Sequence, residues 1–218
     1  AAGERCMAIS VAVPVGEETA DKLIKKLIPR VEALKIGPYT SGEDVDFGPV
    51  ITAASKANIE NLVQTGIDQG ASLVVDGRGF KLQGYEDGFF VGAHLFDNVT
   101  TDMDIYKKEI FGPVLSTVRA KTYEEAIQMA IDHEYGNGTS IFTRDGDTAR
   151  DFSNRINIGM VGVNVPIPVP LAYHTFGGWK KSMFGDLNQH GPDAFKFFTR
   201  TKTITYRWPS GIKEGGEF

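Results

Sequence analysis

The chain has 218 residues, of which 41% are hydrophobic and 23% charged, as in an ordinary globular protein and unlike a disordered one. Its single cysteine, Cys6, excludes an intramolecular disulfide and a zinc site built from several cysteines. The net charge of −5 argues against binding to nucleic acid or to an anionic membrane. There is no apolar run of about 18 residues to cross a bilayer, and the first residues do not resemble a secretory signal peptide. We therefore expect a soluble protein of the cytoplasm, or of the mitochondrial matrix in a eukaryote.

Hydrophobic periodicity predicts helices that alternate with short strands. In chain order we expect a strand at 11–15, a helix at 19–34, a helix capped by Thr52 and ending near Gly70, strands at 72–75, 89–91 and 114–118, a helix from Thr122 to about 133, a strand at 140–143, a helix at 148–156, and strands at 160–165 and 201–208. Pro29 should kink or shorten the first helix. Thr122 and Glu125 have the spacing of a capping box, and Asp147 is the expected cap of the 148–156 helix. This alternation favours a parallel or mixed sheet covered by helices.

Cys6 is the first candidate for chemistry. It follows Arg5 and precedes a turn at 7–9 that could begin a short helix. A helix N-terminus and a guanidinium both stabilise a thiolate, which is the nucleophilic form of the side chain. On residue type alone, however, a lone cysteine is more often a small buried hydrophobic residue. The four histidines are scattered without the spacing of a metal site, so we expect no metal.

Glu109-Ile110-Phe111-Gly112-Pro113-Val114 is the second candidate, because it joins a charged stretch to an apolar strand. A carboxylate such as Glu109 can hold a diol, for example a ribose, through two hydrogen bonds. An aromatic ring two residues later, Phe111, can pack against a planar ring. The alternative is a plain loop-to-strand corner with a solvated glutamate.

Three glycine- or proline-rich segments complete the set. The proline-spaced run after Asn164 forces extended backbone, which could carry Asn164 into a cleft. The glycine pair after Phe176 permits a tight turn or a close backbone approach, and the third segment is Gly136-Asn137-Gly138. The sequence has no Walker A motif and no G-x-G-x-x-G at a strand–helix junction, so it carries no dinucleotide fingerprint.

Taken together, these motifs resemble the aldehyde dehydrogenase superfamily, in the family's order and with similar intervals. They are Gly3-Glu4-Arg5-Cys6, Glu109 to Val114, Asn164, Phe176-Gly177-Gly178-Trp179-Lys180-Lys181-Ser182 and Thr201 to Thr205. Within the superfamily the sequence is most similar to the CoA-acylating methylmalonate-semialdehyde dehydrogenases. Arginine directly before Cys6 and the segment at 163–170 carry that similarity.

The resemblance implies an α/β catalytic domain, with a mixed and largely parallel sheet flanked by helices, followed by an oligomerisation strand. Residues 1–195 would form the catalytic domain, and 196–218 the strand and tail. The family's NAD-binding domain precedes the cysteine, so we expect it to be absent from this chain and the isolated chain to be inactive. We also expect self-association, as a dimer or tetramer, through the strand at 201–208.

The resemblance also implies a mechanism. Cys6 would attack an aldehyde to form a thiohemiacetal, hydride would pass to NAD, and coenzyme A would take the acyl group from the resulting thioester. The substrate would be a small anionic semialdehyde, and the Cys6 backbone N–H would be an oxyanion donor. The implied binding residues are Arg5, Asn164 and Phe176 on the substrate side, and Glu109 and Phe111 around the nicotinamide and its ribose.

Two alternatives stay open. In a hydrolytic aldehyde dehydrogenase, water rather than coenzyme A would take the acyl group from Cys6, and the general base that would discriminate lies outside this sequence. In a non-catalytic assembly domain, Cys6 would be buried and 201–208 would be an edge strand for pairing.

Overall fold

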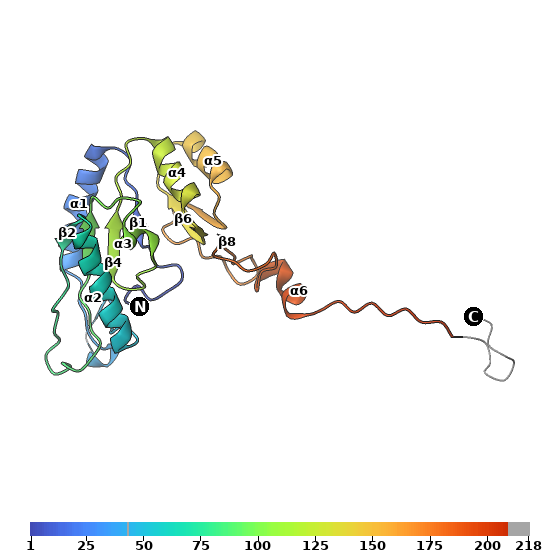
Figure 1. Ribbon diagram of the computed structural model, residues 1–218, viewed down its shortest axis with the longest axis horizontal. Coiled ribbons are helices and arrows are strands. Elements are labelled where there is room, and N and C mark those ends of the chain that lie inside the picture. The colour runs from blue at the N-terminus through green and yellow to red at the C-terminus, as the bar shows by residue number, and fades with distance from the viewer. Residues whose placement is uncertain (43, 209–218) are drawn as a thin grey trace.

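The computed structural model describes residues 1–42 and 44–208, and it shows an α/β fold (Figure 1). A four-stranded sheet of order β1-β4-β3-β2 organises the first half. Its strands are β1 (Val11–Ala12), β2 (Ser72–Val75), β3 (His94–Asp97) and β4 (Val114–Thr117). The pairs β1·β4 and β3·β4 are parallel and β2·β3 is antiparallel, so the predicted mixed, largely parallel sheet is confirmed.

Helices lie against this sheet, and two of them, α2 and α3, share one hydrophobic core with it. The helical elements here are α1 (Glu17–Glu32), the short 3-10 helix η1 (Tyr39–Ser41), α2 (Ala53–Asp68) and α3 (Asp104–Lys107). The predicted apolar stripe of α2 is buried at Ile59, Leu62 and Val63, which share the core with Phe96 of β3. Burial of this stripe fixes α2 against the sheet, and the loop that begins α2 lies next to the first residues of the chain.

A second layered unit follows, with its own small core. Its elements are α4 (Tyr123–Asp132), β5 (Tyr135–Gly136), β6 (Gly138–Ile141), α5 (Gly146–Arg155), β7 (Met160–Val163), β8 (Trp179–Lys180), the 3-10 helix η2 (Gly191–Asp193) and α6 (Ala194–Phe198). The strands β6 and β7 pair in parallel, and β5 pairs antiparallel with β8. Ile127 of α4 and Phe152 of α5 lie in the core of this unit.

Side-chain caps confirm two predicted helix starts. Thr52 Oγ1 accepts a hydrogen bond of 3.0 Å from the Ser55 N–H at the start of α2. Thr122 Oγ1 accepts one of 3.2 Å from the Glu125 N–H, and the Glu125 carboxylate in turn accepts one of 2.6 Å from the Lys121 N–H. The Thr122 half of the predicted capping box is therefore formed, whereas the Glu125 carboxylate reaches the N–H one residue before the cap instead of that of Thr122.

The first helix differs slightly from its prediction. It begins at Glu17 rather than Thr19, and it continues past Pro29 to Glu32. Proline has no N–H to donate, so one intrahelical hydrogen bond is missing at Pro29. The helix nevertheless continues beyond Pro29 and ends at Glu32, a little before the predicted end. Two glutamates in the first turn favour the earlier start, because negative charge is stabilised at a helix N-terminus.

The strand predicted at 89–91 is wrong. The chain there passes so close to Gly77 that a Cβ on Gly92 would lie 2.5 Å from the Gly77 carbonyl oxygen. The strand comes later, as β3, and all of its residues are buried. Its polar ends, His94 and Asp97, conceal it in the sequence, because a strand buried on both faces shows no alternation.

Several element ends also differ from prediction. The cap of α5 is Asp145, whose Oδ1 accepts a 2.6 Å hydrogen bond from the Thr148 N–H, and not Asp147. The strand predicted at 140–143 starts two residues earlier, at 138. The strand β7 ends before Asn164, because that residue has a φ of 56° and cannot continue a strand. The short helix α3 was not predicted.

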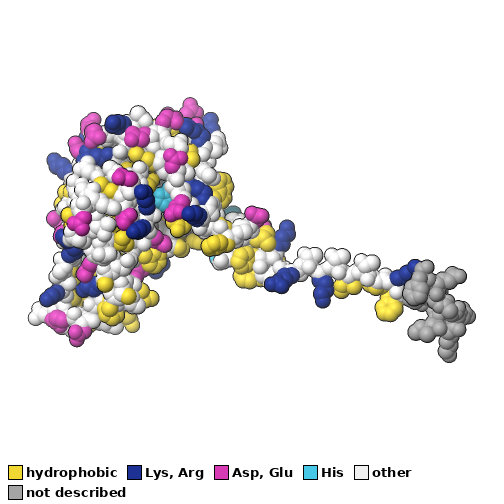
Figure 2. Space-filling model, viewed as in Figure 1, with side chains coloured by type: hydrophobic (Ala, Val, Ile, Leu, Met, Phe, Trp, Pro, Cys, Tyr) yellow, Lys and Arg dark blue, Asp and Glu magenta, His cyan; other side chains and the backbone are white. Residues whose placement is uncertain are grey.

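The C-terminal part extends away from both cores (Figure 1). Residues 201–208 are exposed (Figure 2), and within the described part of the chain they belong to no strand. The half-buried strand predicted there is therefore not formed within this single chain, and the proposed oligomerisation role stays a prediction. The predicted tail at 209–218 lies outside the described residues. No helix in the described ranges is both long and apolar enough to span a bilayer.

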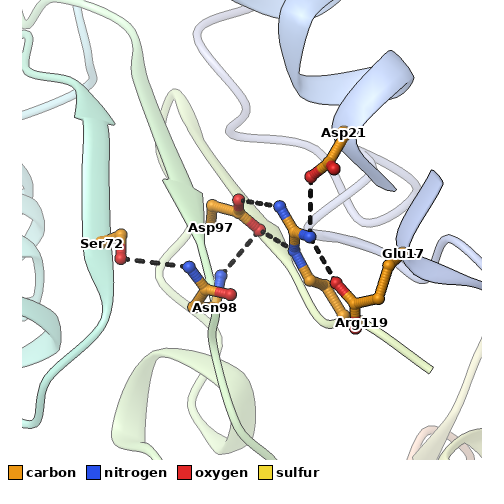
Figure 3. Close-up of polar contacts among 6 residues, drawn as sticks. All are labelled: Glu17, Asp21, Ser72, Asp97, Asn98 and Arg119. Atoms are coloured by element: carbon orange, nitrogen blue, oxygen red, sulfur yellow. Dashed lines mark hydrogen bonds and ion pairs between the residues drawn. The ribbon is translucent and has the colours of Figure 1, made fainter. Parts of the chain in front are cut away.

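Arg119 ties α1 to the main sheet (Figure 3). Its guanidinium donates to both carboxylate oxygens of Asp97 at the end of β3, at 3.0 and 2.7 Å. The same group donates to Glu17 at 2.6 Å and to Asp21 at 2.9 Å, both on α1. Burial by itself would raise the pKa of the Asp97 carboxyl, but hydrogen bonds from Arg119 and the Asn98 backbone outweigh it and hold the pKa below 3.8. The carboxylate therefore stabilises the fold above about pH 3.8, and that stabilisation is lost as the pH falls further.

We expect Arg119→Met to lower the free energy of unfolding by about 2–4 kcal/mol, because it leaves the buried Asp97 carboxylate without its cation. Urea denaturation at neutral pH measures this change. Adding Asp97→Asn should recover part of the loss, because it removes the stranded charge. Glu17→Gln is the matched surface control, with an expected cost below about 0.5 kcal/mol. Equal costs for Arg119→Met and Glu17→Gln would contradict the prediction.

Candidate active site

Tight turns place the Cys6 thiol at the surface. Backbone hydrogen bonds from Arg5 N to the Gly3 carbonyl (2.9 Å) and from Ala8 N to the Arg5 carbonyl (3.0 Å) close them. No helix follows Cys6, so the predicted contribution of a helix N-terminus to its thiolate is wrong. The thiol is exposed in this chain, so Cys6 is not a buried hydrophobic residue of its core. The alternative of a non-catalytic assembly domain stays untested.

Glycine lets this turn lie directly against the corner at 109–114. Gly3 has a φ of 75°, and a Cβ on it would lie 2.1 Å from the Gly112 carbonyl oxygen. Gly112 in turn faces α2, where its own Cβ would lie 2.5 Å from Ile59 Cδ1. The nucleophile turn, the corner and the core helix are therefore stacked in contact, with room for glycine only.

A small pocket forms where the turn meets the corner. It brings together Arg5 and Cys6 from the turn with Glu109 and Phe111 from the corner. These are four of the six residues that the sequence singled out, from segments about a hundred positions apart. Arg5 is exposed and makes no ion pair with any described residue, so its guanidinium is available to an anion. The Cys6 N–H likewise has no hydrogen-bond acceptor within the described ranges.

The rim of the pocket fits a nucleotide. Glu109 is exposed, and among the described residues its carboxylate has neither a hydrogen-bond donor nor a cation, so both oxygens can accept from hydroxyls. Phe111 has a φ of 55° and is 43% exposed, although its neighbour Ile110 is buried. An exposed carboxylate and an exposed ring on one corner suit a ribose and a planar heterocycle.

Glu4 anchors the nucleophile turn, a role that the sequence reading did not identify. Its Oε2 accepts a 2.9 Å hydrogen bond from the Ile51 N–H, in the residue just before the Thr52 cap of α2. The carboxylate thus lies beside the N-terminus of a 16-residue helix, where negative charge is favoured. This contact fixes the position of the turn relative to the core.

Asn164 and Phe176 do not line this pocket. The Asn164 amide is engaged with Thr143, accepting from its N–H and donating to its carbonyl, each at 3.0 Å. Phe176 is partly buried, and its ring makes an edge contact with His190 at a centroid distance of 6.0 Å. Their roles on the substrate side stay predictions.

We expect Asn164→Ala to destabilise the protein by about 1–3 kcal/mol, because both backbone groups of Thr143 lose their partner. The φ of 56° adds strain that asparagine tolerates and alanine does not. Chemical denaturation measures the loss. A large rise in KM for aldehyde without any loss of stability would contradict this structural role and favour the predicted substrate role.

Two further residues with specific contacts were not identified from the sequence. Lys180 donates from Nζ to three carbonyls at the end of α4, those of Ala130 and Ile131 at 3.0 Å and of His133 at 2.7 Å. Burial lowers the pKa of Lys180, although the ammonium remains the natural cap for a helix C-terminus. The second is Asn137, whose side chain contacts the Cys6 backbone. The only signal for either was its place in a glycine-rich motif.

With this geometry established, comparison with known proteins identifies the family. The model of the aldehyde dehydrogenase family matches residues 1–204. The chain belongs to the aldehyde dehydrogenase family. This confirms the resemblance that the sequence motifs indicated.

Curated relatives show which members of the family this chain is most similar to. The chain is 61% identical over 207 residues to the malonate-semialdehyde dehydrogenase of Pseudomonas aeruginosa, covering 95% of this chain and 41% of that protein. It is 46% identical over 210 residues to the mitochondrial, acylating methylmalonate-semialdehyde/malonate-semialdehyde dehydrogenase of Bos taurus, covering 95% of this chain and 38% of that protein. The chain thus spans about two fifths of the length of these relatives.

Solved structures of the family share the fold. A crystal structure described as a methylmalonate-semialdehyde dehydrogenase of Sinorhizobium meliloti, complexed with NAD, matches with a TM-score of 0.90 and 72% identity, over 98% of this chain and 43% of that one. The NAD⁺ complex of a Mycobacterium tuberculosis aldehyde dehydrogenase matches with a TM-score of 0.83 and 29% identity, over 97% of this chain and 42% of that one.

Proposed function

We propose that this chain carries the catalytic cysteine of an NAD-dependent, CoA-acylating malonate- or methylmalonate-semialdehyde dehydrogenase. The observation that carries the proposal is the single pocket shared by Arg5, Cys6, Glu109 and Phe111. The pocket combines an exposed thiol, a free guanidinium, a free carboxylate and an exposed ring. The names of the related proteins support the same substrate class and cofactor.

Cys6 performs the covalent chemistry. Its sulfur attacks the aldehyde carbon as the thiolate, and the thiohemiacetal that forms carries the negative charge on its oxygen, which the unpartnered Cys6 N–H stabilises. As the carbonyl reforms, the same carbon loses its hydrogen as hydride, and Cys6 is left as a thioester. NAD, when bound, supplies the acceptor for that hydride. The thiol of coenzyme A then displaces Cys6 from the acyl group, which restores the free cysteine.

Arg5 binds the distal carboxylate of the substrate. A semialdehyde of malonate or methylmalonate carries one carboxylate close to its aldehyde carbon. A guanidinium can hold a carboxylate through two parallel hydrogen bonds, and Arg5 directly precedes the nucleophile in the same pocket. This pairing orients the aldehyde towards Cys6 and selects anionic substrates over neutral ones.

Glu109 and Phe111 form the nicotinamide side of the pocket. The free Glu109 carboxylate accepts from the ribose hydroxyls next to the nicotinamide, and Phe111 lines the place of the ring. Both come from one rigid corner packed on α2, so they hold the cofactor at a fixed position relative to Cys6.

We also propose that residues 201–208 pair with a second copy of the chain. Ile204, Tyr206 and Trp208 are 70, 72 and 84% exposed, and they alternate with polar residues as in a strand with one apolar face. Because no described element covers this face, a second copy is its natural partner.

The acyl acceptor is tested by measuring steady-state NADH formation by the full-length gene product with malonate semialdehyde, with and without coenzyme A. We expect turnover with coenzyme A, and about one NADH per active site without it, because the Cys6 thioester has no other efficient acceptor. Unchanged turnover without coenzyme A would instead identify water as the acceptor and establish the hydrolytic alternative.

A further inference from the structure

We propose that Asn137 is a positioning residue that aims Cys6, by holding the peptide group that follows the nucleophile. Its Nδ2 donates a 2.9 Å hydrogen bond to the Cys6 carbonyl oxygen, from a position 131 residues further along the chain. The same Nδ2 lies 3.3 Å from the Met7 sulfur. The proposal rests on the proposed function only in taking Cys6 as the nucleophile.

The contact acts on the one peptide plane that the nucleophile turn leaves free. The turn is closed by the hydrogen bond from Ala8 N to the Arg5 carbonyl, which joins its outer two peptide groups. The middle group, between Cys6 and Met7, takes no part in that bond, and in the described chain its carbonyl is held by Asn137. Rotation of this plane changes ψ of Cys6 and φ of Met7, the two backbone dihedrals at the centre of the turn. Asn137 therefore holds the part of the turn that the Arg5–Ala8 hydrogen bond leaves free, and so keeps the backbone that carries the thiol in place.

Asn137 is itself held firmly enough to serve as a reference point. Its carbonyl accepts a 3.1 Å hydrogen bond from Met160 N at the start of β7, and the preceding residue donates from its N–H to Ser182 Oγ at 3.0 Å. The following residue is glycine, and a Cβ on Gly138 would lie 2.5 Å from Met7 Cε. The segment at 136–138 thus presents one amide donor and leaves room for the Met7 side chain beside it.

Holding the Cys6 carbonyl requires a hydrogen-bond donor, which the asparagine side chain supplies through its amide. Aspartate has nearly the shape of asparagine but offers only acceptors to the Cys6 carbonyl, and leucine has a similar size but no donor. A misplacement of reacting atoms by about 1 Å can cost about 100-fold in rate. We therefore expect Asn137→Asp and Asn137→Leu each to slow acylation of Cys6 by about 10–100-fold.

The experiment measures single-turnover NADH formation by the full-length gene product, mixed rapidly with NAD and malonate semialdehyde without coenzyme A. The amplitude counts the folded active sites, whereas the rate constant reports how well the Cys6 thiol is oriented in those sites. The matched control is Asn98→Asp, the same chemical change at an exposed residue, Asn98, whose amide contacts Ser72 at the β2–β3 edge. Alkylation of Cys6 by iodoacetamide is measured in parallel, because that small reagent needs little orientation.

The expected result is a rate constant 10–100-fold lower in both Asn137 variants, with Cys6 alkylation within about threefold and Asn98→Asp unchanged. A lower amplitude with an unchanged rate constant would show a purely structural role and overturn the proposal. So would an unchanged rate constant in either variant. Many turnovers by the unmutated protein without coenzyme A would refute the proposed acyl acceptor, while the first-turnover rate constants would still decide the role of Asn137.

Discussion

Replacing Cys6 by alanine is expected to abolish NADH formation, with a loss of kcat on the order of 10⁴-fold or more. The thiol is the strongest nucleophile among the residues that line the pocket, and without it neither the thiohemiacetal nor the thioester can form. Activity of the full-length gene product is followed by NADH absorbance with saturating malonate semialdehyde, NAD and coenzyme A.

The control for this variant is its stability. Because Cys6 is exposed, its replacement should change the free energy of unfolding by less than about 0.5 kcal/mol, and loss of activity cannot then be attributed to unfolding. A folded Cys6→Ala protein that retains more than about a hundredth of the activity would exclude covalent catalysis by this residue.

Arg5→Met is expected to lower kcat/KM for malonate semialdehyde by about 10–100-fold. A charge-assisted hydrogen-bond pair contributes about 1.5–3 kcal/mol, and each 1.4 kcal/mol corresponds to about a tenfold change. The same variant should leave kcat/KM for propanal, which has no carboxylate, within about threefold of the unmutated value, because the lost guanidinium does not contact that substrate. Paired steady-state assays on the two aldehydes provide the measurement.

A matched control separates substrate binding from a general charge effect. Arg30→Met removes the same charge from an exposed arginine in the last turn of α1, and both aldehydes should react as before. Equal losses on malonate semialdehyde and propanal in Arg5→Met would contradict carboxylate binding. That result would show instead that Arg5 acts on the reactivity of Cys6.

Local signals in the sequence predicted those parts of the fold that depend on neighbouring residues. The caps at Thr52 and Thr122 were predictable, because each is satisfied by a backbone N–H three residues further on. The strand β3 was missed, because it is buried by pairing with strands on both of its sides, one of them preceding it and one following it. Its own four residues carry no alternation that would reveal this environment.

The candidate site was predictable to a similar extent. The family motifs pointed to Arg5, Cys6, Glu109 and Phe111, and the structure brings these residues to one pocket. The supporting contacts could not be inferred, because Glu4 bonds to Ile51, 47 positions away, and Asn137 bonds to the Cys6 backbone, 131 positions away. Such contacts depend on how two layers are packed together, which no local pattern encodes.

The most direct test of the account is to find where the acyl group is attached. The full-length gene product is incubated with NAD and malonate semialdehyde without coenzyme A, quenched in acid and digested, and its peptides are analysed by mass spectrometry. We predict an acyl group on the peptide that contains Cys6, dependent on NAD and removed when coenzyme A is added before the quench. NADH formation with an unmodified Cys6 peptide, or with the acyl group on a different residue, would contradict the account.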